Sequence, residues 1–183
     1  LMTVLLVGAS LFYERQENTL KTLMITPSSY TSILLSKIIA SIYLAMQSTL
    51  VISLVAVFAF DISIKLFWLY IFVILIGLAH SAIGYTFTMF SRDFNGLLAA
   101  IGGYMIVFAI PSLISALGIF SEAFDNVLMI SPTHAALELI NFSMGSEVAL
   151  WKLIFGTLYL ITISIVLYKY VVARKYAEMA VRE

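Results

Sequence analysis

Only a few residues of this sequence belong to types that carry out chemistry, and their spacing matches no catalytic motif. The chain contains no cysteine and two histidines, His80 and His134, which are too few for a metal cage. It has no Ser-His-Asp set, no paired carboxylates and no Gly-x-x-x-x-Gly-Lys-Ser/Thr loop of the kind that binds ATP. The sequence therefore predicts a protein that is not an enzyme, with no catalytic residue, metal or cofactor in this chain.

Two groups of small and polar residues lie at helical spacing within long apolar segments. The first consists of Gly77, His80, Ser81 and Gly84, and the second of Ser36, Ala40, Tyr43 and Gln47. Small residues let helices approach closely, and serine or histidine can hydrogen-bond across the contact. We favour tight helix–helix packing for both groups, and a substrate path or a dimer contact is the alternative. A proton relay through His80 would need a carboxylate inside a span, and the predicted spans contain none.

The composition requires a lipid environment around most of the chain. Hydrophobic residues make up 62% of the sequence and charged residues 11%, and the mean hydropathy is +1.07. Soluble domains carry roughly 45–50% apolar and about 25% charged residues. The formal net charge of zero gives no reason to expect nucleic acid as a partner. We expect an all-α, polytopic membrane helical bundle formed by a single transmembrane domain.

A helix needs roughly 20 mostly apolar residues to cross the hydrocarbon core of a bilayer. Four complete spans are expected at about residues 38–60, 66–90, 95–120 and 149–172. The run at about residues 1–12 would reach only about 20 Å. We interpret it as the C-terminal half of a span that begins upstream, in a longer protein.

The basic residues indicate how these spans are oriented. Eight would lie on one side, namely Arg15, Lys21, Lys37, Arg92, Lys169, Arg174, Lys175 and Arg182. Only Lys65 and Lys152 would lie on the other side. Because basic residues accumulate on the cytoplasmic side, the C-terminus is predicted to be cytoplasmic and the segment at residues 121–148 external.

Three segments between or within the spans have distinct patterns. Residues 13–24 are polar and charged with apolar residues interspersed at helical spacing, which is typical of a helix lying on the cytoplasmic membrane surface. Residues 132–144 are expected to form a short external helix. Gly102, Gly103 and Pro111 interrupt the third complete span, where proline usually kinks a helix. We favour a bend that packs well, and a hinge for outward opening is the alternative.

The stretch ERQENTLKTLMITPSSYTSILLSKI resembles the cytoplasmic signature of type-2 ATP-binding-cassette (ABC) exporter permeases. The matching residues are Glu14, Arg15, Thr19, Leu20, Leu23, Thr26, Pro27, Leu34, Leu35 and Lys37, whereas Gln16, Asn18, Lys21 and Ser36 depart from the pattern. The sequence ISPTH at residues 130–134 is similar to the start of the external helix in that family. The closest resemblance is to the drug (fluoroquinolone-type) export group.

The resemblance implies a transport function with several partners. Residues 13–24 would be the coupling helix, which contacts a separate nucleotide-binding ATPase subunit through Glu14, Arg15, Glu17, Asn18, Thr19, Leu20 and Leu23. ATP and Mg would be bound by that subunit, and a second permease copy or paralogue would complete a dimer. The implied substrate is drug-like or amphipathic, exported across a bacterial or archaeal plasma membrane, and the external helix would close the outer gate. A secondary transporter or channel-like protein without an ATPase partner is the alternative.

Overall fold

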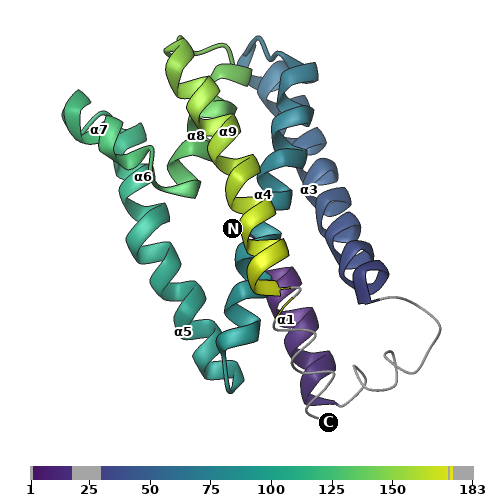
Figure 1. Ribbon diagram of the computed structural model, residues 1–183. Helices are drawn as coiled ribbons and strands as arrows, with labels where there is room; N and C mark the ends of the chain where they lie inside the picture. Colours follow the sequence, from purple (N-terminus) through teal and green to yellow (C-terminus); the bar gives the residue numbers. More distant parts are fainter. Residues whose placement is uncertain (1, 18–29, 173, 175–183) are drawn as a thin grey trace.

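The computed structural model describes residues 2–17, 30–172 and 174, which form helices joined by short connections and contain no strand (Figure 1). Four helices in the described part of the chain are long and apolar enough to cross a membrane. The predicted all-α, polytopic membrane bundle with four complete spans is therefore confirmed.

Two of the long helices are continuous and two contain a π-helical segment. The continuous ones are α3 (Tyr30–Phe60) and α4 (Leu66–Phe90). The third span consists of α5 (Phe94–Tyr104), the π-helical η1 (Met105–Ala109) and α6 (Ile110–Ala116). The fourth consists of α9 (Leu150–Val166) and the π-helical η2 (Leu167–Val172). A shorter apolar helix, α1 (Met2–Gln16), lies beside α4.

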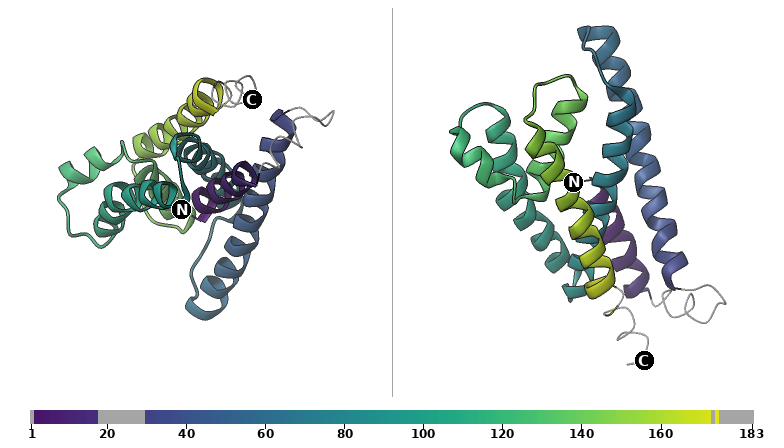
Figure 2. Two further views of the ribbon diagram at one scale, coloured as in Figure 1. Left: turned by 90° about the horizontal axis from the view of Figure 1, so that it is seen from below. Right: turned by 45° about the horizontal axis from the view of Figure 1, so that its top comes forward.

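The helix α4 occupies the centre of the bundle. It contacts α1, α3, α5, α8 (Pro132–Ser143) and α9, and the two views in Figure 2 show these helices arranged around it. Buried side chains of α1, α4 and α5 form one core cluster, which includes Val4, Ile83 and Leu97. In a bilayer, helices associate mainly through such close packing and hydrogen bonds, because lipid is as apolar as the side chains.

Two short helices connect the third span to the fourth. They are α7 (Glu122–Leu128) and α8, and the hydroxyl groups of Ser121 and Ser131 cap their first turns. Serine is a favoured N-cap because its oxygen accepts a hydrogen bond from a backbone N–H group that has no partner within the helix. The predicted external helix at residues 132–144 thus has its counterpart in α8, whereas α7 was not predicted.

Several helices begin or end at other residues than the predicted segments do. The helix α1 continues without a break to Gln16, so a separate surface helix does not begin at residue 13. The helix α3 begins at Tyr30 rather than at residue 38. It includes Lys37, whose charge is paired with Glu14 of α1, so this lysine does not have to lie beyond the end of the helix. The third span ends at Ala116, and Gly118 turns the chain with a left-handed φ of 71°.

Candidate functional site

The glycines of the stripe on α4 lie where other helices approach most closely. A Cβ atom on Gly84 would lie 2.6 Å from the carbonyl oxygen of Val4 in α1. A Cβ atom on Gly77 would lie 2.9 Å from Cγ1 of Ile42 in α3. A larger residue at Gly84 would require the backbone of α1 to move, and one at Gly77 would require the side chain of Ile42 to move. The two glycines therefore face different helices rather than one common path.

The polar residues of the same stripe are buried and hydrogen-bonded. Nδ1 of His80 lies 2.9 Å from the carbonyl oxygen of Ile76, to which it can only donate. This leaves Nε2 to accept a hydrogen bond from the Tyr104 hydroxyl, at 3.3 Å. The Ser81 hydroxyl lies 2.7 Å from that of Tyr168 in η2. His80 and Ser81 thus connect α4 to the third and fourth spans.

The second stripe lies on a surface of α3 that no other described helix covers. Tyr43 is 60% exposed, and the Gln47 amide donates a hydrogen bond of 3.0 Å to its hydroxyl. Ser36 and Ala40, which share this face, are exposed as well. The structure therefore does not bring Tyr43 and Gln47 together with the stripe of α4. A polar face near the middle of an apolar span needs a polar partner, because lipid offers no hydrogen bonds.

The predicted hinge residues lie on both sides of the π-helical segment η1. Gly102 and Gly103 come just before η1, and a Cβ atom on either would meet no atom within 4 Å. Pro111 comes just after it, in the first turn of α6. The carbonyl oxygen of Phe108 within η1 accepts hydrogen bonds from the hydroxyl groups of Ser112 (2.6 Å) and Thr133 (2.7 Å). The start of α8 is thus attached to the irregular part of the third span.

The predicted coupling residues lie at the opposite end, and the structure describes them only in part. Glu14 is paired with Lys37 across α1 and α3, and Glu17 is exposed. The side chain of Arg15 and all of Asn18, Thr19, Leu20 and Leu23 lie outside the described residues. The Glu14–Lys37 ion pair therefore joins the end of α1 to the beginning of α3, next to this segment.

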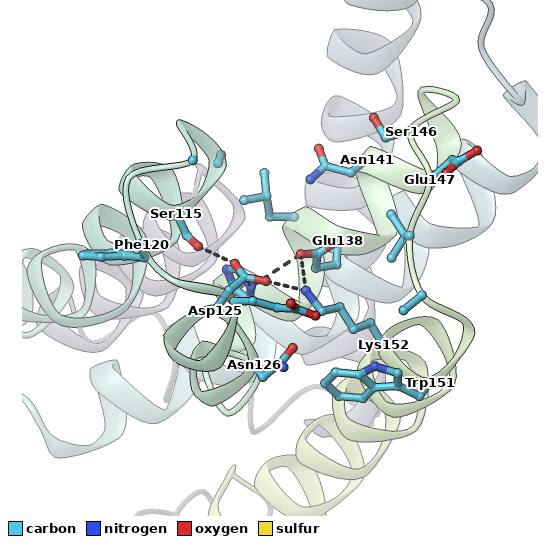
Figure 3. Close-up of a pocket in the computed structure, with 17 residues that line it drawn as sticks. Ser115, Phe120, Asp125, Asn126, Glu138, Asn141, Ser146, Glu147, Trp151 and Lys152 are labelled. Carbon is cyan, nitrogen blue, oxygen red and sulfur yellow. Dashed lines mark hydrogen bonds and ion pairs between the residues drawn. The ribbon is translucent and has the colours of Figure 1, made fainter.

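A group of charged side chains on α7, α8 and the start of α9 was not predicted (Figure 3). It consists of Asp125 from α7, His134 and Glu138 from α8, and Lys152 from α9. The Lys152 ammonium binds Asp125 Oδ2 and lies 3.3 Å from Glu138 Oε1, and the Ser115 hydroxyl donates to Asp125 Oδ1. The group borders a cavity of about 500 Å³ between the two short helices and α9. Its ion pairs connect α7, α8 and α9.

Burial and charge act against each other in this group. Burial tends to raise the pKa of Asp125, but the hydrogen bonds from Lys152 and Ser115 and the nearby positive charges outweigh it, so the pKa is lowered. Burial lowers the pKa of His134, and the carboxylates of Asp125 and Glu138 only partly oppose this. His134 is therefore neutral at neutral pH, while Asp125 is ionised.

The only sequence signal for this group was the four-residue spacing of His134 and Glu138, which places both on one face of a helix. The other members come from α7, whose helix was not predicted, and from the beginning of the last span. Spacing along the chain could not show that these elements meet.

Comparison with known proteins identifies one related family. The model of a family described as ABC-2 family transporter protein matches residues 1–102, which is more than half of the 183 residues. Curated proteins and solved structures give no significant match. The matched part contains α1, α3, α4 and the segment between α1 and α3.

Proposed function

The chain belongs to the ABC-2 family of transporter proteins, and we propose that it is the membrane-spanning permease subunit of an ATP-driven exporter. The family match over residues 1–102 carries this proposal, together with the four apolar helices long enough to cross a membrane. The substrate that we propose is drug-like or amphipathic, as in the export group that residues 14–38 resemble.

The energy would come from a separate ATPase subunit. The sequence has no loop of the kind that binds ATP phosphates, so ATP and Mg would be bound and hydrolysed on that partner. The partner would contact residues 13–24. These residues connect to α1 and, through residues 25–29, to α3, and the Glu14–Lys37 ion pair joins both helices. A displacement at this end would therefore reach two membrane helices together.

A second permease copy or a paralogue would cover the exposed face of α3. Only 11% of the residues in the apolar window of this helix are buried, and its Tyr43–Gln47 pair faces away from the bundle. A polar group exposed to lipid costs several kcal/mol. Contact with a second subunit, or with a substrate path between two subunits, would remove that cost.

We propose a plasma-membrane location, in a bacterium or archaeon, with the C-terminus in the cytoplasm. The basic residues Lys37, Arg92 and Lys169 lie near one end of the bundle, where α3 begins, α4 turns into α5 and η2 ends (Figure 1). Lys65 lies at the other end, just before α4 begins. Cysteines introduced at the exposed residues Ser63 and Ser146 should be labelled from outside intact cells, and one at Asn95 should not be. Labelling of Asn95→Cys from outside would reverse the orientation.

Copurification tests the proposed function directly. The full-length protein, tagged and purified in mild detergent from its own cells, should carry an ATPase subunit, and transport substrates should stimulate ATP hydrolysis after reconstitution. Arg15→Ala and Leu20→Asp should reduce both the retention of that subunit and the stimulation, because the first removes a guanidinium and the second places a carboxylate in an apolar contact. A tagged protein without ATPase activity, or two variants that behave as wild type, would favour a secondary transporter or channel.

A further inference from the structure

The side chains of Asp125, His134 and Glu138 converge at the external end of the bundle. One possible ligand atom from each residue lies within 4.8 Å of the other two. Asp125 is supplied by α7, and the other two lie one helical turn apart on α8. From this arrangement we propose that the three residues bind a divalent transition-metal ion of the Zn²⁺ type, a site that goes beyond the proposed transport function and does not depend on it.

His134 gives an independent reason to expect a ligand here. Its side chain is only 1% exposed, and neither ring nitrogen makes a hydrogen bond of ordinary geometry among the described residues. Nε2 nevertheless points at two carboxylates, with 3.3 Å to Asp125 Oδ1 and 3.6 Å to Glu138 Oε1. A buried polar atom without a hydrogen bond destabilises the folded protein. A metal ion at Nε2 would satisfy it, and the neutral imidazole is the form that binds metals.

The two distances from the histidine nitrogen to the carboxylate oxygens fit tetrahedral coordination. Zinc is bound by histidine nitrogen and carboxylate oxygen at about 2.0–2.2 Å, so neighbouring ligand atoms around a tetrahedral ion lie roughly 3.3–3.5 Å apart. The separations of Nε2 from the two carboxylate oxygens, 3.3 and 3.6 Å, match this spacing. Three protein ligands would leave the fourth position for water from the adjoining cavity. The Ser115 hydroxyl, which donates to Asp125 Oδ1, would orient that ligand.

The type of ligand selects the class of metal. Calcium takes six to eight oxygen ligands, and magnesium is usually bound by one or two carboxylates together with several waters. A set of one imidazole and two carboxylates suits zinc and its neighbours in the first transition row. We therefore use zinc as the probe ion in the test of this site.

Lys152 already places a positive charge at these carboxylates. Its ammonium lies 3.3 Å from Glu138 Oε1, the same oxygen that would ligate the metal, and also binds Asp125 Oδ2. A metal ion and this ammonium would repel each other at close range. Lys152 would have to turn away from Glu138 when the metal binds, and binding would loosen the connection between α8 and α9. Removal of a ligand should therefore weaken metal binding, whereas removal of the Lys152 charge should strengthen it.

The test measures metal binding to the full-length protein in detergent. After removal of metals with a chelator, titration with Zn²⁺ should show one site per chain. His134→Gln should weaken binding at least about tenfold, since a ligand is lost. Lys152→Met should strengthen it at least about tenfold, because a competing charge is removed. Co²⁺ bound to the wild type should give the intense visible absorption of a tetrahedral complex, and His134→Gln should abolish it.

Matched controls separate this site from general binding to acidic residues. Glu122 and Glu147 border the same cavity. In the described part of the chain, His134 is paired with Asp125 and Glu138 but with neither of these two glutamates. Glu122→Gln and Glu147→Gln should leave Zn²⁺ binding unchanged. Elution at the wild-type volume on a sizing column would show that each variant is folded. The proposal is overturned if folded wild type binds no Zn²⁺, if His134→Gln binds as tightly as wild type, or if Lys152→Met does not bind more tightly.

Discussion

The helices α3 and α4 are both long and strongly apolar, yet they occupy opposite positions in the bundle. In the apolar window of α4, 50% of the residues are buried, compared with 11% in that of α3. Hydropathy, which identifies both as spans, does not distinguish the central helix from the peripheral one.

The small and polar residues of the two helices explain the difference. In α4 they face neighbouring helices, and Gly84 lies directly against the backbone of α1. In α3 the pair of Tyr43 and Gln47 faces away from the bundle. The same pattern of residue types thus builds the interior in one helix and an uncovered surface in the other. Substitutions on the two helices should therefore have effects of different size.

The largest effect is expected at Gly84. Gly84→Ala would place Cβ 2.6 Å from the carbonyl oxygen of Val4, and because backbone atoms cannot turn aside, α1 would have to move. We expect a loss of about 1–3 kcal/mol, seen as a clear decrease in Tm in detergent. Gly103→Ala is the matched control, since its Cβ meets no atom within 4 Å. Because alanine favours a helix more than glycine does, Gly103→Ala should not lower Tm, and an equal decrease in both variants would show that packing against α1 is not the cause.

An intermediate effect is expected at Tyr85, which joins the two helices. Its hydroxyl donates a hydrogen bond of 2.8 Å to the carbonyl oxygen of Leu34 in α3. Tyr85→Phe should lower the free energy of unfolding by about 1 kcal/mol, because a buried bond between helices is lost. Tyr70→Phe, also in α4, should have almost no effect on Tm, since no hydrogen bond of that hydroxyl is found among the described residues. Unchanged stability in Tyr85→Phe would mean that this hydrogen bond does not help to hold α3 against α4.

The smallest effect on the stability of a single chain is expected at Gln47. Gln47→Leu removes an exposed amide whose partner is the neighbouring Tyr43. The free energy of unfolding, obtained from thermal unfolding in detergent, should therefore change by no more than about 0.5 kcal/mol. Transport and crosslinking between chains through α3 should nevertheless decrease. Gln47→Leu with full transport and normal crosslinking would indicate that this face contacts only lipid.

The sequence was sufficient for the class of fold and for the existence of the spans. Long apolar segments predict membrane helices well, because a bilayer leaves few alternatives for the backbone. The helix α3 begins at Tyr30, before the predicted span, and includes Lys37, whose partner Glu14 comes from another helix. Such pairing across helices has no local signal.

The segment that contains α7 and α8 was predicted least well, for a related reason. The helix α7 is seven residues long, and its stability depends on the Ser121 cap and on contacts that the chain makes only after folding. The group of Asp125, His134, Glu138 and Lys152 draws on three elements. Only the spacing of His134 and Glu138 can be recognised from the sequence alone. The partner and the substrate remain proposals because neither leaves a residue pattern in this chain beyond the cytoplasmic signature.

Because α3 is long, the thickness of the bilayer should affect how far this helix tilts. Its 31 residues would extend roughly 46 Å, whereas the hydrocarbon core measures about 30 Å. The part after Lys37 accounts for roughly 34 Å and fits a core of this thickness with a moderate tilt. A thicker membrane would bring α3 closer to the bilayer normal, and a thinner one would incline it further. Because Lys37 is paired with Glu14, α1 would follow this change.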